Sequence, residues 1–234
     1  MNNDCYGSTF TGRSVIKGWS DFHFYEFVRH DVHGLCLFLD GVLQSAERDQ
    51  HIYHEKLVRA ALEEQQFPHD VLIIGGAGGG VLHHLCRILN PDSCHVTIVD
   101  IDEKLFSTGR KIMRSWNQGE FDNPNVDVVF ADGSEYLHNV SKCFDVIILD
   151  VGDPLPYTRS NDLYSPKVLF DLGRALRPDG IVAFHSALEL TSEHIFISES
   201  LHGSGTLQKI SHFPVNIESF ERTWMFNTLK KHSL

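Results

Sequence analysis

The chain has 234 residues, of which 42% are hydrophobic and 22% charged, and its formal net charge is −11. This length and composition are ordinary for a globular protein with one large domain and a small appendage. The negative charge argues against a broad nucleic-acid interface, and no apolar run approaches the length of about eighteen residues that a membrane span needs.

Cysteine usage and the N-terminal residues predict a cytoplasmic protein without metal. The N-terminal segment MNNDCYGSTFTGRS has no apolar stretch of the signal-peptide kind. The five cysteines are scattered without a Cys-x-x-Cys pair, so we expect reduced thiols. Fifteen histidines are dispersed, and the pair His83-His84 lacks the third ligand of a zinc site.

Residues 1–50 are expected to form a small N-terminal β domain. Alternation over Phe22–Val28 and the apolar run Leu35–Leu39 predict an antiparallel pair, joined by a hairpin turn that ends at Gly34. From Gln50 the apolar spacing becomes helical, and Pro68 marks the end of that segment.

Residues 51–234 are expected to form a Rossmann-like catalytic domain, because predicted strands and helices alternate there. The predicted strands are Val71–Ile74, Val96–Val99, Val126–Phe130, Phe144–Leu149 and Ile181–Phe184. The predicted helices are Glu103–Trp116, Glu135–Val140, Tyr164–Leu176 (closed by the turn RPDG) and 192–201, and the segments Gln208–Ser211 and Thr223–Asn227 are expected to close the sheet as an antiparallel pair. The fold class is therefore α/β, with a mostly parallel sheet.

A glycine-rich turn, GGAGGG over Gly75–Gly80, joins the strand Val71–Ile74 to a predicted helix. Such a corner is typical of nucleotide-binding sheets, because glycine lets a ligand lie against bare backbone. The turn lacks the Lys-Ser/Thr of a phosphate loop and is not a clean dinucleotide fingerprint. A tight turn without a ligand is the alternative interpretation.

Three later strands each end at an aspartate: Asp100, Asp132 and Asp150. Ligands of such sheets bind outside the carboxyl ends of the strands. Asp100 can accept hydrogen bonds from ribose hydroxyls, and Asp132 can accept one from an adenine amino group, so the two describe an adenosine pocket. A single aspartate in this position is commonly a helix cap instead.

These motifs resemble the polyamine aminopropyltransferases, the spermidine and spermine synthases. The resemblance extends from Phe24 to Ser186 and keeps the order of FLDGVLQSAERDQHIYHE, VLIIGGAGGG, VTIVDID, FADGSEYL and FDVIILDVGDP. It implies an S-adenosylmethionine-dependent transferase sheet with a small N-terminal β-hairpin or sheet domain. It also implies a transfer reaction that releases methylthioadenosine.

The resemblance implies a role for each matching residue. Asp150 takes the proton from an attacking amine, Asp153 holds that amine, and Tyr53 lines the boundary between donor and acceptor. Residues 154–162 match a loop that closes over the site. The implied donor-binding residues are Gln44, His54, Gly75, Gly76, Gly78, Asp100, Asp132, Gly133 and Asp150, and no metal is implied. A carboxylate suits this chemistry, because amines are mostly protonated at neutral pH.

Gly78 departs from the family, which has an aspartate that pairs with the amino end of decarboxylated S-adenosylmethionine. Its loss removes a charge that would repel the carboxylate of intact S-adenosylmethionine. We therefore expect a 3-amino-3-carboxypropyl donor, with 3-aminopropyl transfer from the decarboxylated form as the alternative.

The acceptor side departs too. His185-Ser186 replaces a Gln-Gly turn, and HFPVNIESFERTW replaces the later family motif. Putrescine is therefore in doubt as the acceptor, and a peptide-nucleotide acceptor in antibiotic biosynthesis, as in microcin C-type tailoring, is a further possibility.

Three other functions stay open at this point: a spermidine synthase proper that uses putrescine, an S-adenosylmethionine-dependent methyltransferase, and a non-catalytic nucleoside-binding relative. The motifs that flank the glycine turn speak against the methyltransferase. The expected partners are a small-molecule or peptide-nucleotide acceptor and a second copy of the chain in a homodimer, without nucleic acid or membrane.

Overall fold

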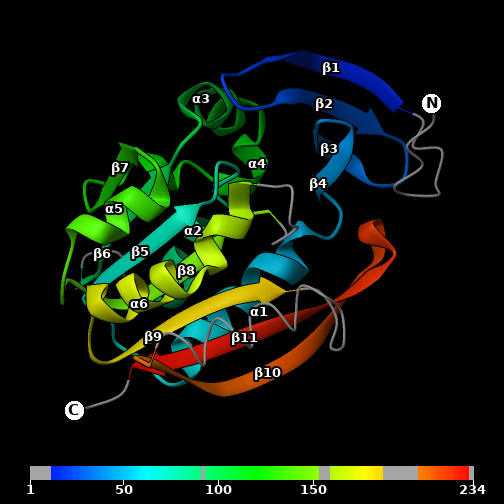
Figure 1. Cartoon of the computed structure of the whole chain (residues 1–234). Helices are drawn as coiled ribbons and strands as arrows, with labels where there is room; N and C mark the ends of the chain where they lie inside the picture. The colour runs from blue at the N-terminus through cyan, green and yellow to red at the C-terminus, as the bar shows by residue number, and fades with distance from the viewer. Residues whose placement is uncertain (1–11, 91–92, 153–158, 187–204, 232–234) are drawn as a thin grey trace.

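The computed structural model describes residues 12–90, 93–152, 159–186 and 205–231, with backbone alone for residues 159–161 and 222. Two sheets make up the molecule: a four-stranded N-terminal sheet and a seven-stranded central sheet (Figure 1). The predicted α/β fold class is confirmed. No helix in the described ranges is both long and apolar enough to cross a membrane.

The N-terminal sheet is antiparallel, in the order β1-β2-β3-β4. Its strands are β1 (Gly12–Trp19), β2 (Phe24–His30), β3 (Gly34–Leu39) and β4 (Val42–Ala46). The predicted hairpin is the pair β2–β3. Strand β1 was not predicted, because nearly all its residues are exposed and no apolar alternation marks it. Strand β4 follows a tight turn in which Asp40 and Gly41 both have positive φ.

The central sheet has the order β10-β11-β9-β8-β5-β6-β7, so the strand before the glycine turn, β5, lies inside it. Strands β5 to β9 run parallel, and β11 joins β9 in antiparallel fashion. The bounds are β5 (Asp70–Gly75), β6 (His95–Asp100), β7 (Val126–Phe130), β8 (Phe144–Asp150), β9 (Leu176–Ser186), β10 (Leu207–Ile217) and β11 (Arg222–Lys231).

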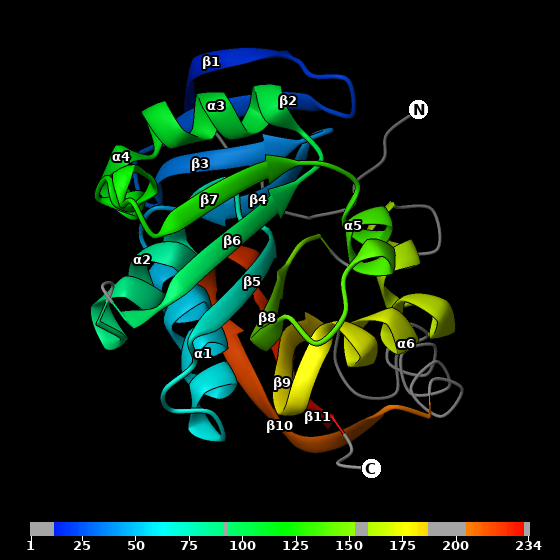
Figure 2. The same cartoon turned by 90° about the vertical axis from the view of Figure 1, so that its left-hand side faces the viewer.

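Helices cover both faces of the central sheet (Figure 2). One face packs on α1 (Gln50–Glu63) and α2 (Gly80–Ile88), and the other packs on α5 (Gly133–Asn139) and α6 (Pro166–Ala175). Alternate residues of each strand point to opposite faces. In β8, Val146 and Ile148 therefore belong to the α1 side, whereas Ile147 and Leu149 belong to the α6 side.

The N-terminal sheet packs against α3 (Glu103–Ile112) and α4 (Arg114–Asn117) through a small apolar cluster. That cluster contains Tyr25, Phe27, Leu35, Leu37, Leu105, Met113 and Trp116. The expectation of one continuous helix over 103–116 was wrong: the chain turns at Met113. This turn lets both Met113 and Trp116 point into the cluster.

The remaining differences from the predicted elements are small. The residues RPDG, expected as a turn, lie within β9, which starts at Leu176. Short 3-10 helices occur at η2 (Glu120–Asp122), η3 (Arg159–Tyr164) and η4 (Glu218–Phe220). The expected helix at 192–201 lies outside the described residues. The division into domains 1–50 and 51–234 stays a prediction.

Candidate active site

The glycine turn after β5 lies directly beside the end of β8. Gly75 pairs with Asp150 in the sheet, and the Gly76 amide donates to the Asp150 carbonyl oxygen (3.2 Å). Gly75 and Gly76 have φ values of +84° and +86°, and a Cβ atom on Gly75 would lie 2.2 Å from that carbonyl oxygen. Glycine is therefore required at position 75 on both conformational and steric grounds. A Cβ on Gly76 would lie 3.3 Å from Asp150 Oδ2, so the Asp150 side chain extends over the turn.

Tyr53 and His185 join Asp150 in one polar cluster. Tyr53 Oη lies 2.6 Å from His185 Nδ1 and hydrogen-bonds to the Asp150 carboxylate. Removal of Asp150 from solvent raises its pKa to about 6, against the lowering effects of His185 and of the Tyr53 hydrogen bond. Asp150 is thus a carboxylate whose proton affinity lies close to neutral pH, as a general base requires.

Strand register explains why these residues meet. Leu149 pairs with Phe184, so Asp150 and His185 follow at the adjacent ends of β8 and β9. Both continue the alternation of residues that face α1, and Tyr53 lies on that helix. His185 was not among the predicted site residues. Its place directly after the strand Ile181–Phe184 is the signal that could have identified it.

His54, a predicted donor-binding residue, is buried against the start of α2. Its exposed fraction is 6%, and its Nδ1 lies 2.5 Å from Gln50 Oε1. A Cβ on Gly80 would lie 2.1 Å from that Nδ1. The last glycine of the turn therefore makes room for the His54 ring. Burial lowers the pKa of His54 to about 3, so the ring is neutral at physiological pH.

Asp100 lies at the end of β6, where ribose binding was predicted. Its carboxylate accepts a hydrogen bond from the Asp102 amide (2.8 Å), and Asp102 in turn caps α3 by accepting one from the Leu105 amide (2.9 Å). Burial is the largest cause that raises the pKa of Asp100 to about 6. The structure thus places a second high-pKa carboxylate at this sheet edge.

Asp132 is the N-cap of α5. Its Oδ1 accepts hydrogen bonds from the Ser134 amide (2.8 Å), the Ser134 hydroxyl (2.6 Å) and the Glu135 amide (3.2 Å). The capping alternative is therefore correct for this residue, and adenine binding stays a prediction. The next residue, Gly133, is close to Ile74, because a Cβ there would lie 2.8 Å from Ile74 Cγ2.

Gln44 and Gly78 are two further predicted site residues that the structure describes. Gln44 lies on β4, where its side-chain amide donates to the Val42 carbonyl oxygen (3.2 Å). A Cβ on Gly78 would point toward α4 and its neighbours, 3.1 Å from Met113 Sδ and 3.4 Å from Trp116 Cε3. Asp153 and most of the loop 154–162 lie outside the described residues.

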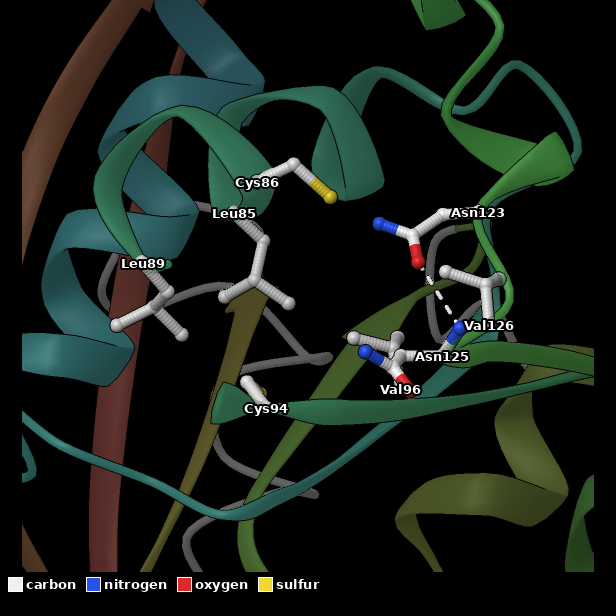
Figure 3. A pocket seen from close by; sticks show the side chains of 8 residues that line it. All are labelled: Leu85, Cys86, Leu89, Cys94, Val96, Asn123, Asn125 and Val126. Atoms are coloured by element: carbon white, nitrogen blue, oxygen red, sulfur yellow. Dashed lines mark hydrogen bonds between the residues drawn. The ribbon is translucent and has the colours of Figure 1, made fainter. Parts of the chain in front are cut away.

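An apolar crevice on the molecule lies away from this site. It has an internal volume of about 10 Å³ and sits between α2 and the amino ends of β6 and β7 (Figure 3). Its lining residues are Leu85, Cys86, Leu89, Cys94, Val96, Asn123, Asn125 and Val126. A volume this small holds about one water molecule at most. Burial raises the pKa of Cys86 to about 12 and that of Cys94 to about 11, so both thiols are protonated at neutral pH.

No group of three or more His, Cys, Asp or Glu side chains in the described ranges is arranged to hold a metal ion. The polar atoms at the sheet edge are carboxylates, a phenol and imidazoles. Such a set suits proton transfer and hydrogen bonding to hydroxyl and amino groups.

Comparison with known proteins gives consistent matches. Polyamine aminopropyltransferase 2 of Hyperthermus butylicus is 36% identical over 70% of this chain and 53% of its own length, and the polyamine aminopropyltransferase of Aeropyrum pernix is 31% identical over 91% and 67%. The chain thus spans between half and two thirds of these relatives. A crystal structure of spermidine synthase in complex with the transition state analogue AdoDATO superposes on this chain with a TM-score of 0.85 at 24% sequence identity. The match covers 94% of this chain and 74% of the spermidine synthase chain, and it shows that the fold is shared. The model of the spermine/spermidine synthase domain matches residues 50–233. The chain therefore belongs to the spermine/spermidine synthase domain family.

Proposed function

We propose that the chain transfers a 3-aminopropyl-type group from an S-adenosylmethionine-type sulfonium donor to a nucleophilic acceptor and releases methylthioadenosine. The observation that carries the proposal is the Asp150 carboxylate: it ends β8, extends over the glycine turn and has a pKa of about 6. The names of the matched relatives support the same reaction class.

In this reaction the protein forms no covalent bond to either substrate. The acceptor lone pair attacks the methylene carbon next to the sulfonium, so a new bond forms as the carbon–sulfur bond breaks. The electron pair of that bond stays on sulfur, which leaves as a neutral thioether. For an amine acceptor, the nitrogen proton passes to Asp150, whose carboxylate also orients the amine before attack.

The donor is assigned to the carboxyl edge from β5 to β7. There Asp100 and Asp132 supply carboxylate oxygens for the ribose and the adenine. In this proposal Asp132 has two roles, because it caps α5 through Oδ1 and also binds the adenine.

A second candidate is 3-amino-3-carboxypropyl transfer from intact S-adenosylmethionine. The observation that favours it is Gly78, which places no carboxylate where a donor carboxylate would be repelled. The variants Gly78→Asp and Gly78→Asn have side chains of equal size next to Met113 and differ in charge. If Gly78 sets the donor, the Asp variant shifts the ratio of turnover toward the decarboxylated donor and the Asn variant does not. An equal ratio in both variants contradicts this candidate.

The direct test gives each donor separately to the purified full-length chain, with a panel of amines, including putrescine, and peptide-nucleotide acceptors. Mass spectrometry then follows the nucleoside product. Methylthioadenosine supports the proposal, and the donor that yields it decides between the two candidates. S-adenosylhomocysteine would instead show a methyltransferase, and no product with bound donor would indicate a nucleoside-binding relative.

Two further properties remain predictions that belong with this function. The first is a homodimer: light scattering should give twice the mass of one chain, and the mass of a single chain would contradict it. The second is a cytoplasmic location: the protein should fractionate with cytosolic markers in its host cell.

A further inference from the structure

The hydroxyl group of Tyr53 lies between two hydrogen-bonding partners, and it has one hydrogen to give. Its oxygen is 2.6 Å from His185 Nδ1, and it donates to the carboxylate of Asp150. An ionised carboxylate can only accept, so the Tyr53 hydrogen is used there. Nδ1 of His185 must then carry a hydrogen of its own and donate it to the Tyr53 oxygen.

We propose that His185 is a positioning residue for the transfer reaction: its Nδ1–H donates to the Tyr53 hydroxyl and thereby keeps that hydroxyl directed at Asp150. The inference rests on the proposed function, in which Asp150 takes the proton from the acceptor. His185 acts through Tyr53 and needs no contact with either substrate. The order of donation is His185 to Tyr53 and Tyr53 to Asp150.

The His185 ring is held in place on several sides. Its backbone pairs with Phe226 of β11, and the Tyr164 hydroxyl donates to its carbonyl oxygen (3.5 Å). The Trp224 ring meets it edge-on, with ring centres 5.4 Å apart, and the exposed fraction of His185 is 5%. The Tyr53 ring packs against it at 5.3 Å. A ring so enclosed presents Nδ1 in one direction, which is what a positioning role requires.

The titratable groups near this ring come from three elements. Tyr53 lies on α1, with the His54 ring packed against it, Asp150 lies on β8 and Tyr164 on η3, while β11 contributes the uncharged rings of Trp224 and Phe226. His54 is neutral at physiological pH, since burial lowers its pKa to about 3. Within this described set, Asp150 supplies the negative charge. A hydrogen-bond chain that ends on Asp150 favours its ionised form, which is the form that accepts a proton.

The tautomer of His185 can be measured without any assay of activity. Long-range proton–nitrogen NMR spectra of the full-length chain, with nitrogen-15 in its histidines, are recorded at pH 7.5. The His185 signals are identified by their loss in His185→Asn. We expect Nδ1 to be protonated, whether or not Nε2 is protonated too. An unprotonated Nδ1 overturns the proposal, whatever the chain transfers.

Kinetic measurements test the consequence for the reaction. His185→Leu removes the Nδ1–H group that donates to Tyr53, so we expect kcat to be roughly tenfold lower. We also expect the pKa that governs the acid limb of the kcat/KM profile to rise by about half a unit to one unit. His185→Asn places a side-chain N–H near the former Nδ1 and should restore kcat to within about threefold of the parent chain. Equal losses in both variants overturn the proposal.

Two controls separate positioning from general damage. His95→Leu makes the same exchange at the amino end of β6, where His95 pairs with Asp127 (3.0 Å), and should leave kcat and the acid limb unchanged. Tyr53→Phe breaks the same hydrogen-bond chain as His185→Leu. The fold-loss of kcat in the double variant should therefore be much smaller than the product of the two single fold-losses. A fully multiplicative loss contradicts a shared chain. If the parent chain forms no methylthioadenosine, the proposed function fails while the NMR test still decides the tautomer.

Discussion

The two halves of the carboxyl edge of the central sheet use the same residue type differently. At the end of β6 and just after β7, Asp100 and Asp132 accept hydrogen bonds from nearby backbone amides. The Asp102 amide donates to Asp100 at 2.8 Å, and the Ser134 amide donates to Asp132 at 2.8 Å. At the end of β8, Asp150 accepts its hydrogen bond from Tyr53, a side chain on a different element. Local amide donors tie Asp100 and Asp132 to the residues that follow their strands, whereas Asp150 is held by a donor from another helix.

This contrast suggests a division of labour along one edge. The β6–β7 half is tied into its own loops and is suited to hold a ligand without moving. The β8–β9 half brings a carboxylate, a phenol and an imidazole together beside α1. Aspartates at strand ends therefore differ in the element that supplies their hydrogen-bond donor.

The largest expected effect separates the two halves directly. Asp150→Asn removes the proposed base, so we expect kcat to fall by about 10³-fold, within the range general bases contribute. The raised pKa also means that the folded state binds a proton at Asp150 more tightly than the unfolded state, which costs stability as pH rises through about 6. The Asn variant should thus be more stable than the parent by about 3 kcal/mol at pH 8.

Denaturant titrations at two pH values check the second half of this prediction. The stability gain should vanish below about pH 4, where both states carry a protonated Asp150. A variant that loses both activity and stability at pH 8 would instead mark Asp150 as a structural residue.

Gly80→Ala tests whether the glycine turn serves packing as well as ligand binding. The new Cβ would lie 2.1 Å from His54 Nδ1, so we expect the free energy of unfolding to fall by about 2 kcal/mol through overpacking. Thermal or denaturant unfolding measures the change. In a His54→Ala background the same substitution should cost almost nothing, and an undiminished cost there would show that His54 is not the cause.

The pH profile gives an intermediate effect. If Asp150 accepts the proton as a carboxylate with a pKa of about 6, kcat/KM should fall tenfold for each pH unit below that value and level off above it. The acid limb should be absent in Asp150→Asn, measured on its residual activity. A limb near pH 4 in the parent chain would show that Asp150 is not desolvated during turnover.

The smallest effect concerns the other half of the edge. Asp132→Ala removes the cap of α5 and should lower the free energy of unfolding by about 1 kcal/mol. Asp132→Asn keeps an N-cap and should restore stability. If Asp132 also binds the donor as a carboxylate, the Asn variant still shows a raised KM for the donor at normal kcat. A normal KM for the donor in Asp132→Asn would show that Asp132 caps the helix and does not bind the donor as a carboxylate.

Both the strand–helix alternation and the motif order could be predicted from the sequence. The buried runs before Asp100 and Asp150 are short, apolar and bounded by polar residues, so their place in a parallel sheet follows from local pattern. The weak predictions were the exposed strand β1 and the helix break at Met113. Strand β1 forms by pairing with β2, and the break at Met113 accompanies packing of Met113 and Trp116 against the N-terminal sheet, so neither leaves a mark in periodicity.

The sequence by itself determined the fold class, the glycine turn and the strand-end carboxylates, because these depend on residues that are neighbours in the chain. Only the tertiary structure decided that Gly80 accommodates His54 and that Tyr53 connects His185 to Asp150. The physical reason is that each of these roles is set by side-chain direction and by donors brought from other elements. Strand register and the docking of α1 supply both, and neither can be read from spacing along the chain.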